Sequence, residues 1–70
     1  MSVYKFVELV GTSPNSWEEA AASAVNMAAE TLRDIRVADV VELDMHIENN
    51  KITAYRAKVK VSFKVEKHNV

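Results

Sequence analysis

The chain has no cysteine and only one glycine and one proline among its 70 residues. The lack of cysteine excludes disulfides, thiolate zinc sites and cysteine nucleophiles. Nine Lys and Arg residues against ten Asp and Glu residues give a net charge of −1, so nucleic-acid binding is not expected. No long apolar run follows a basic start, so we expect neither a signal peptide nor a membrane span. A cytoplasmic location follows by elimination.

What the chain does have is apolar residues, which make up 49% of it. A chain of this length forms a single domain, here residues 1–70, and buries only about 60–65% of its unfolded surface. One helix and three strands cannot hide so much apolar surface. We therefore expect copies of the chain to cover part of one another.

The longest periodic pattern runs from Ser16 to Ile35 and predicts an amphipathic helix. Ser16 and Glu19 have the spacing of a capping box, which satisfies amide groups that the first helical turn leaves unpaired. Because most apolar positions are alanine, another backbone can approach closely, and this favours a curved sheet wrapped around the helix. The apolar residues recur at threes and fours, at Trp17, Ala20, Ala21, Ala24, Ala28, Leu32 and Ile35.

Three further segments predict strands. Residues 3–10 are dense in β-branched and aromatic side chains, and we expect Gly11 to end that strand. Residues 37–48 and 56–65 alternate apolar and polar side chains, and Asn49 and Asn50 supply the left-handed conformations of a hairpin turn. The predicted fold class is α+β, in the order β-α-β-β, with a three-stranded antiparallel sheet around one helix.

The charges of the hairpin select its register. A two-residue loop without irregularity would set Asp44 opposite Tyr55 and would mix polar and apolar faces. A loop one residue longer, or a compensating bulge, sets charges opposite charges and apolar residues opposite apolar residues. We predict this second register, with the pairs Asp44 and Arg56, Glu42 and Lys58, Leu43 and Ala57, and Val41 and Val59.

Candidate ligands for a metal are carboxylates on or near the middle strand. Calcium prefers such oxygens, and although no EF-hand loop is present, symmetric copies can combine single carboxylates into a multidentate cluster. His46 lies among them, but without a second histidine at ligand spacing we interpret it as a solvated side chain. No serine lies in a pattern typical of nucleophilic catalysis, so no enzyme activity is expected. The candidate metal ligands are Asp39, Glu42, Asp44 and Glu48.

The whole chain resembles the dodecin family. The resemblance is carried by residues 8–13 (ELVGTS), 31–33 (TLR) and 55–63 (YRAKVKVSF). It implies β-α-β-β subunits that assemble into a hollow homododecamer, which stores or sequesters a small ligand. Residues 16–18, residues 34–38 and Met45 are similar to the calcium-binding branch of the family, and this similarity implies calcium or another divalent cation as the ligand.

Flavin-binding dodecins stack paired flavins between tryptophans and hold them with a glutamine. At the matching positions this chain has Val37 and Arg56. Val37 offers no aromatic face, and aromatic stacking contributes about 0.5–1.5 kcal/mol per contact beyond area burial. A flavin store, which would hold FMN, FAD or riboflavin through Arg56, is one alternative to the calcium-binding shell. A purely structural assembly module is the other.

Overall fold

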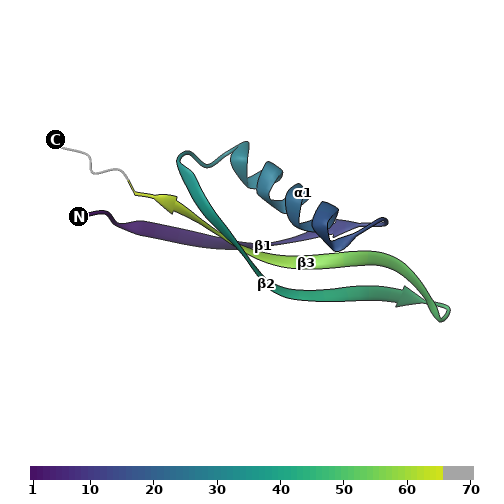
Figure 1. Cartoon of the computed structure of the whole chain (residues 1–70). Helices are drawn as coiled ribbons and strands as arrows, with labels where there is room; N and C mark the ends of the chain where they lie inside the picture. Colours follow the sequence, from purple (N-terminus) through teal and green to yellow (C-terminus); the bar gives the residue numbers. More distant parts are fainter. Residues whose placement is uncertain (66–70) are drawn as a thin grey trace.

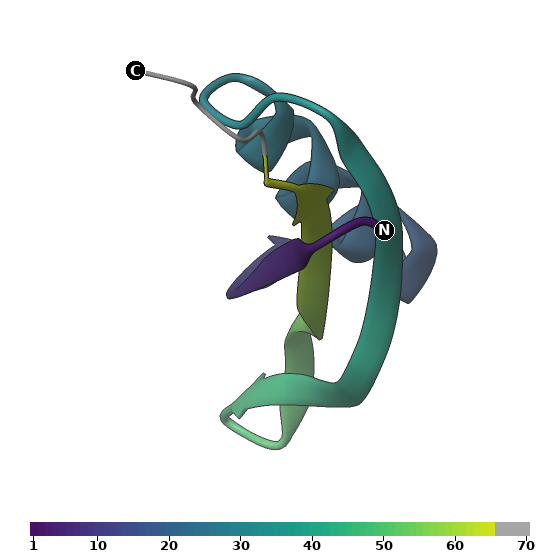
Figure 2. The same ribbon diagram turned by 90° about the vertical axis from the view of Figure 1, so that its left-hand side faces the viewer.

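The structure, a computed structural model, describes residues 1–65. Its elements follow in the order β1 (Tyr4–Ser13), α1 (Trp17–Ala29), β2 (Ile35–Glu48) and β3 (Lys51–Lys64). The three strands form one antiparallel sheet with β3 in the centre. This sheet twists strongly and curves around α1, which lies on one of its faces (Figures 1 and 2). The predicted fold class and element order are therefore confirmed.

The start of α1 is capped as its sequence predicts. The Ser16 hydroxyl accepts a hydrogen bond from the Glu19 amide at 3.0 Å. The second half of the capping box does not form, because the Glu19 carboxylate accepts from the Asn15 side-chain amide at 3.2 Å instead. The Ser16 amide donates to the Ser13 hydroxyl at 3.4 Å. One hydroxyl therefore satisfies the helix and a second satisfies the preceding loop.

The helix ends at Ala29 with Glu30 as its cap, so the predicted end at Ile35 was wrong. Leu32 and Ile35 continue the apolar spacing and do pack against the core, but they do so from the turn and from the start of β2. Asp34 reverses the chain between them with a φ of 59°. Periodicity alone cannot tell a helical core contact from one that a turn makes.

The prediction that Gly11 ends the first strand was wrong, because Gly11 lies inside β1. It pairs with Ala57 of the central strand and faces the helix. A Cβ atom at this position would lie 1.9 Å from the carbonyl oxygen of Ala20, a distance that no van der Waals contact allows. The glycine therefore marks the close approach of α1 to β1.

The core is a thin layer between α1 and the centre of the sheet. Its helical side consists of alanines, and its largest fully buried side chains are two valines of β3. The small residues let the helix lie close to the sheet, as the alanine-rich face predicts. The buried apolar residues are Ala20, Ala24, Ala28, Ala57, Val59 and Val61.

The hairpin register agrees with three of the four predicted pairs: Asp44 and Arg56, Glu42 and Lys58, and Leu43 and Ala57. The turn has two residues, Asn49 and Asn50, with φ values of 51° and 60°, and the register shift that compensates for it leaves Thr53 unpaired. The fourth predicted pair was wrong. Val59 lies opposite Val40, because Val41 is the extra residue of a second irregularity in β2.

Candidate functional site

The carboxylates predicted as metal ligands lie along β2. In a regular strand, Asp39 and Glu42 would point to opposite faces, because they are three residues apart. The irregularity at Val41 changes this alternation, so that Asp39 lies opposite Lys60 and Glu42 opposite Lys58. Asp39, Glu42 and Asp44 thus share the sheet face opposite α1. The cations of β3 that pair with them lie on the same face. The facing pairs on the hairpin are Asp39 and Lys60, Glu42 and Lys58, Asp44 and Arg56, and Glu48 and Lys51.

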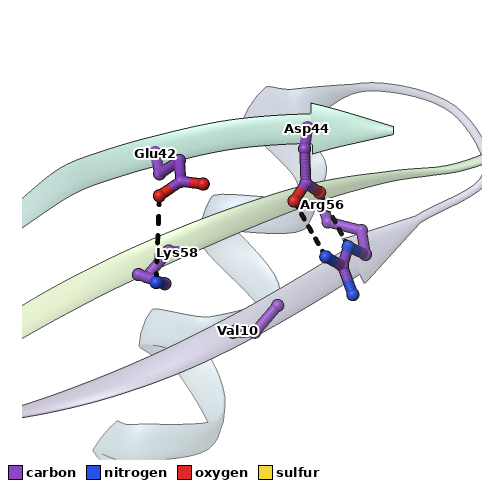
Figure 3. Close-up of a pocket in the computed structure, with 5 residues that line it drawn as sticks. All are labelled: Val10, Glu42, Asp44, Arg56 and Lys58. Carbon is purple, nitrogen blue, oxygen red and sulfur yellow. Dashed lines mark hydrogen bonds and ion pairs between the residues drawn. The ribbon is translucent and has the colours of Figure 1, made fainter. Parts of the chain in front are cut away.

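Asp44 and Arg56 form the closest ion pair of this face (Figure 3). Arg56 Nε donates to Asp44 Oδ1 at 2.7 Å, and Nη2 donates to Oδ2 at 2.8 Å. These two hydrogen bonds hold the pKa of the Asp44 carboxyl below its ordinary value and raise the pKa of Arg56. Both side chains remain nearly half exposed. The pair therefore fixes the geometry of the site more than it stabilises the fold.

The other carboxylates differ in how far they are engaged. Glu42 lies 3.8 Å from Lys58 Nζ, and Glu48 lies 3.1 Å from His46 Nε2. Asp39 makes no ion pair with any of residues 1–65. The ammonium group of the facing Lys60 lies over the Phe6 ring instead, 4.4 Å from its centroid. Asp39 is thus the carboxylate of the four that is available to a cation.

A small pocket of about 110 Å³ lies on the same face, between the ion pairs and β1 (Figure 3). Two carboxylates and two cations line it, so its charge is balanced, and it favours neither a bare cation nor an anion. Nowhere in residues 1–65 do three His, Asp or Glu side chains converge to hold a metal ion. The lining residues are Val10, Glu42, Asp44, Arg56 and Lys58.

The two positions that correspond to flavin-binding residues are not brought together in one chain. Val37 lies opposite Ser62, and Arg56 lies six residues from Ser62 along β3, which amounts to about 20 Å. Val37 is aliphatic and 53% exposed. Arg56 donates two of its five N–H groups to Asp44. A ligand that touched both positions would have to lie between copies of the chain.

Trp17 contributes to this region in a way that sequence analysis missed. Its indole Nε1 donates to the backbone carbonyl of Asp44 at 3.0 Å. Its ring packs edge-on against Tyr55, with 5.2 Å between the centroids. The start of α1 is therefore tied to the strand positions that carry the Asp44 and Arg56 pair. The sequence placed Trp17 on the apolar helix face, but no pattern in it pointed to a hydrogen bond 27 residues away.

These features define a class of small proteins in which one alanine-lined helix lies in a strongly twisted sheet with charge pairs on its other face. The chain belongs to the dodecin family, because a family profile described as Dodecin matches residues 3–66. The resemblance that we found in the sequence is therefore confirmed.

Individual relatives agree with this assignment. The chain is 52% identical over 65 residues to calcium dodecin from Mycobacterium tuberculosis, and the match covers 93% of this chain and 92% of that protein. A crystal structure of that calcium dodecin, described as calcium chelating with a novel calcium-binding site, superposes with a TM-score of 0.82 at 50% identity and 99% coverage of both chains. A Thermus thermophilus protein superposes with a TM-score of 0.89 at 35% identity, and the match covers 97% of this chain and all of that one.

Proposed function

We propose that the protein binds calcium as a hollow homododecamer and sequesters the ion without catalysing a reaction. The observation that carries the proposal is the Asp39 carboxylate, which stands exposed on β2 without an ion pair among residues 1–65. The 52% identity to a calcium dodecin supports calcium as the ion. No helix within residues 1–65 is long and apolar enough to cross a membrane.

The calcium site would be shared between copies of the chain. Calcium takes about 6–8 oxygen ligands, and one carboxylate supplies at most two of them. Because β2 is an edge strand of the sheet, Asp39 can face another copy, and a symmetry axis would repeat it. Glu42, Asp44 and Glu48 are second candidates, since each would first have to leave the partner that it now contacts.

Calorimetric titration of the metal-free protein with calcium tests the role of Asp39. We expect Asp39→Asn, which keeps the shape of the side chain but removes its charge, to weaken calcium binding at least about tenfold, because calcium affinity depends on the charge of its ligands. The matched control is Glu30→Gln, which removes an exposed carboxylate from the end of α1. Equal weakening by both substitutions would point to general electrostatics and would contradict a site at Asp39.

Native mass spectrometry of the purified protein tests assembly and ligand together. We expect the mass of twelve subunits with increments of the size of calcium. A monomer or dimer would contradict the proposed shell. Twelve subunits without calcium, and with the same thermal midpoint in the presence of a chelator, would favour the purely structural module, because an ion bound only by the folded assembly raises that midpoint.

We also infer that flavin is not the ligand. Val37 offers no ring to stack on, and two of the five hydrogen-bond donors of Arg56 are already engaged by Asp44. The protein should therefore be colourless when purified and should leave the absorption spectrum of added FMN unchanged. A yellow protein would contradict this inference and would favour the flavin store.

A further inference from the structure

The hairpin of β2 and β3 extends past the rest of the molecule (Figure 1). Strand β1 ends where Ser13 pairs with Tyr55, and α1 begins at the same level with Trp17 against Tyr55. Beyond that level, residues 46–54 pair only with one another, and we call them the arm. A two-stranded hairpin is marginally stable on its own in water. The arm therefore needs a cover that is present whenever the chain is folded.

The arm has one apolar face and one polar face. Ile47 and Ile52 are cross-strand partners and are 57% and 51% exposed. His46 and Glu48 alternate with Ile47 along β2 and contact each other on the opposite face. Two isoleucines that face each other on an uncovered sheet surface are the pattern of a strand pair that packs onto something apolar.

A groove of matching chemistry lies between α1 and β2. It has a volume of about 370 Å³ and is apolar, apart from Glu18 at its edge. Leu43, which lines the groove, is 48% exposed. It lies on the same face of β2 as Ile47. The arm cannot fold back into the groove of its own chain, because four residues of strand, about 13 Å, separate Leu43 from Ile47. The residues that line the groove are Trp17, Glu18, Ala21, Val40 and Leu43.

We infer that the arm of a second copy fills this groove, with Ile47 and Ile52 packed against Ala21 and Leu43. A second copy is the fitting occupant because it carries both surfaces and is present whenever the first copy is. The charges also match, since the arm ends in the cation Lys51 and the groove carries the carboxylate Glu18. This inference rests on the assembly proposed above and states which surfaces make it.

Engineered disulfides test the contact cleanly, because the chain contains no cysteine. The test variant combines Ala21→Cys with Ile52→Cys. Within one chain, Ile52 lies three strand residues from Tyr55, and Ala21 lies one helical turn from Trp17, so the two sites are about 16 Å apart. A disulfide needs Cα atoms within about 7 Å, so a bond can form only between copies.

We expect mild oxidation of this variant to link most subunits covalently. A product that stops at the covalent dimer would indicate a two-fold contact, and a product of three or more linked subunits would indicate a cyclic contact. Either product supports the arm in the groove. The control variant combines Asn26→Cys with Ile52→Cys, since Asn26 is exposed on α1 outside the groove. It should give no more linked product than Ile52→Cys alone.

A second measurement uses the unsubstituted protein, in case the double variant does not fold. Assemblies refolded from a mixture of unlabelled and ¹⁵N-labelled chains are treated with a carbodiimide, which joins amines directly to carboxylates. We expect a peptide that joins Glu18 of one label to Lys51 of the other. A twelve-subunit assembly in which neither this peptide nor the disulfide exceeds its control would overturn the inference and leave the proposed shell intact. A protein that stays monomeric would overturn both. A different polypeptide seated on the arm of the purified protein would overturn the inference about the arm.

Discussion

The centre of β3 and the arm have the same alternating pattern but opposite surroundings. Ala57, Val59 and Val61 are fully buried because α1 covers them. Ile47 and Ile52 alternate in the same way and remain more than half exposed. The pattern shows which face of a strand is made for burial, but it does not show what buries it. At the centre the cover is the chain's own helix, and at the arm we propose a second copy.

Closing the gap between helix and sheet should have the largest effect on the centre. We expect Gly11→Val to lower the free energy of unfolding by about 3 kcal/mol, the upper end of overpacking effects, because its Cβ would collide with the backbone of Ala20. Urea unfolding measures the change. Thr12→Val, on the exposed neighbouring position, is the control and should stay within about 0.5 kcal/mol. An unchanged midpoint for Gly11→Val would show that the helix can move away without loss.

Emptying the centre should have the next largest effect. Val59→Ala removes two methyl groups from a fully buried side chain, and we expect a loss of about 2 kcal/mol from lost burial and the cavity that remains. The loss should be the same at every protein concentration, because the contact lies within one chain. A loss that grows on dilution would mean that the centre also depends on assembly.

The arm should show the opposite dependence on concentration. Ile47→Ala removes an exposed side chain, and we expect it to weaken association by about 1 kcal/mol per copy, which is the gain from covering roughly half an isoleucine. Dilution followed by mass photometry measures the shift towards smaller species. Thr53→Ser, at the unpaired arm position, serves as the control, because it keeps the hydroxyl that donates to the His46 carbonyl. The distinction between centre and arm fails if Ile47→Ala dissociates at the same concentration as the unsubstituted protein.

The smallest expected effect is that of the Asp44 and Arg56 pair at the junction of the two regions. Because the pKa of Asp44 is lower in the folded state, the pair contributes stability above the ordinary carboxyl pKa of about 4. That contribution is lost as pH falls through the lowered pKa. Asp44→Asn should therefore lower the thermal midpoint at pH 7 but no longer do so in strong acid. In an Arg56→Ala background the substitution should have no effect at either pH, and a persisting effect would assign it to another contact.

Local chemistry allowed much of the fold to be predicted from the sequence. The charges of β2 and β3 fix their register, because a shift by one residue would oppose Asp44 to Tyr55. What could not be predicted depends on contacts between distant elements. Gly11 is explained only by the helix above it, and the end of α1 is hidden because Leu32 and Ile35 reach the core from outside the helix.

The candidate site was less predictable for a related reason. The four carboxylates could be named from the sequence, but the irregularity at Val41, which sets Asp39 on the face of Glu42, was missed. Its only signal in the sequence is the pair of consecutive valines, Val40 and Val41, that interrupts the alternation. The engagement of each carboxylate could be only partly foreseen, because Lys60 faces Asp39 in the register yet contacts Phe6. Neighbours across a symmetry axis leave no trace in one chain, so the assignment of calcium to Asp39 remains a prediction.

The hydrogen bond from Trp17 to the Asp44 carbonyl has an optical consequence. Trp17 is the single tryptophan of the chain, so the ultraviolet emission of the protein originates largely from one indole. Because that indole is held by the backbone of a strand with candidate ligands, a cation that displaces the strand would alter the wavelength or intensity of the emission. The protein thus carries an intrinsic fluorophore at its candidate site, and ligand binding can be followed without a label.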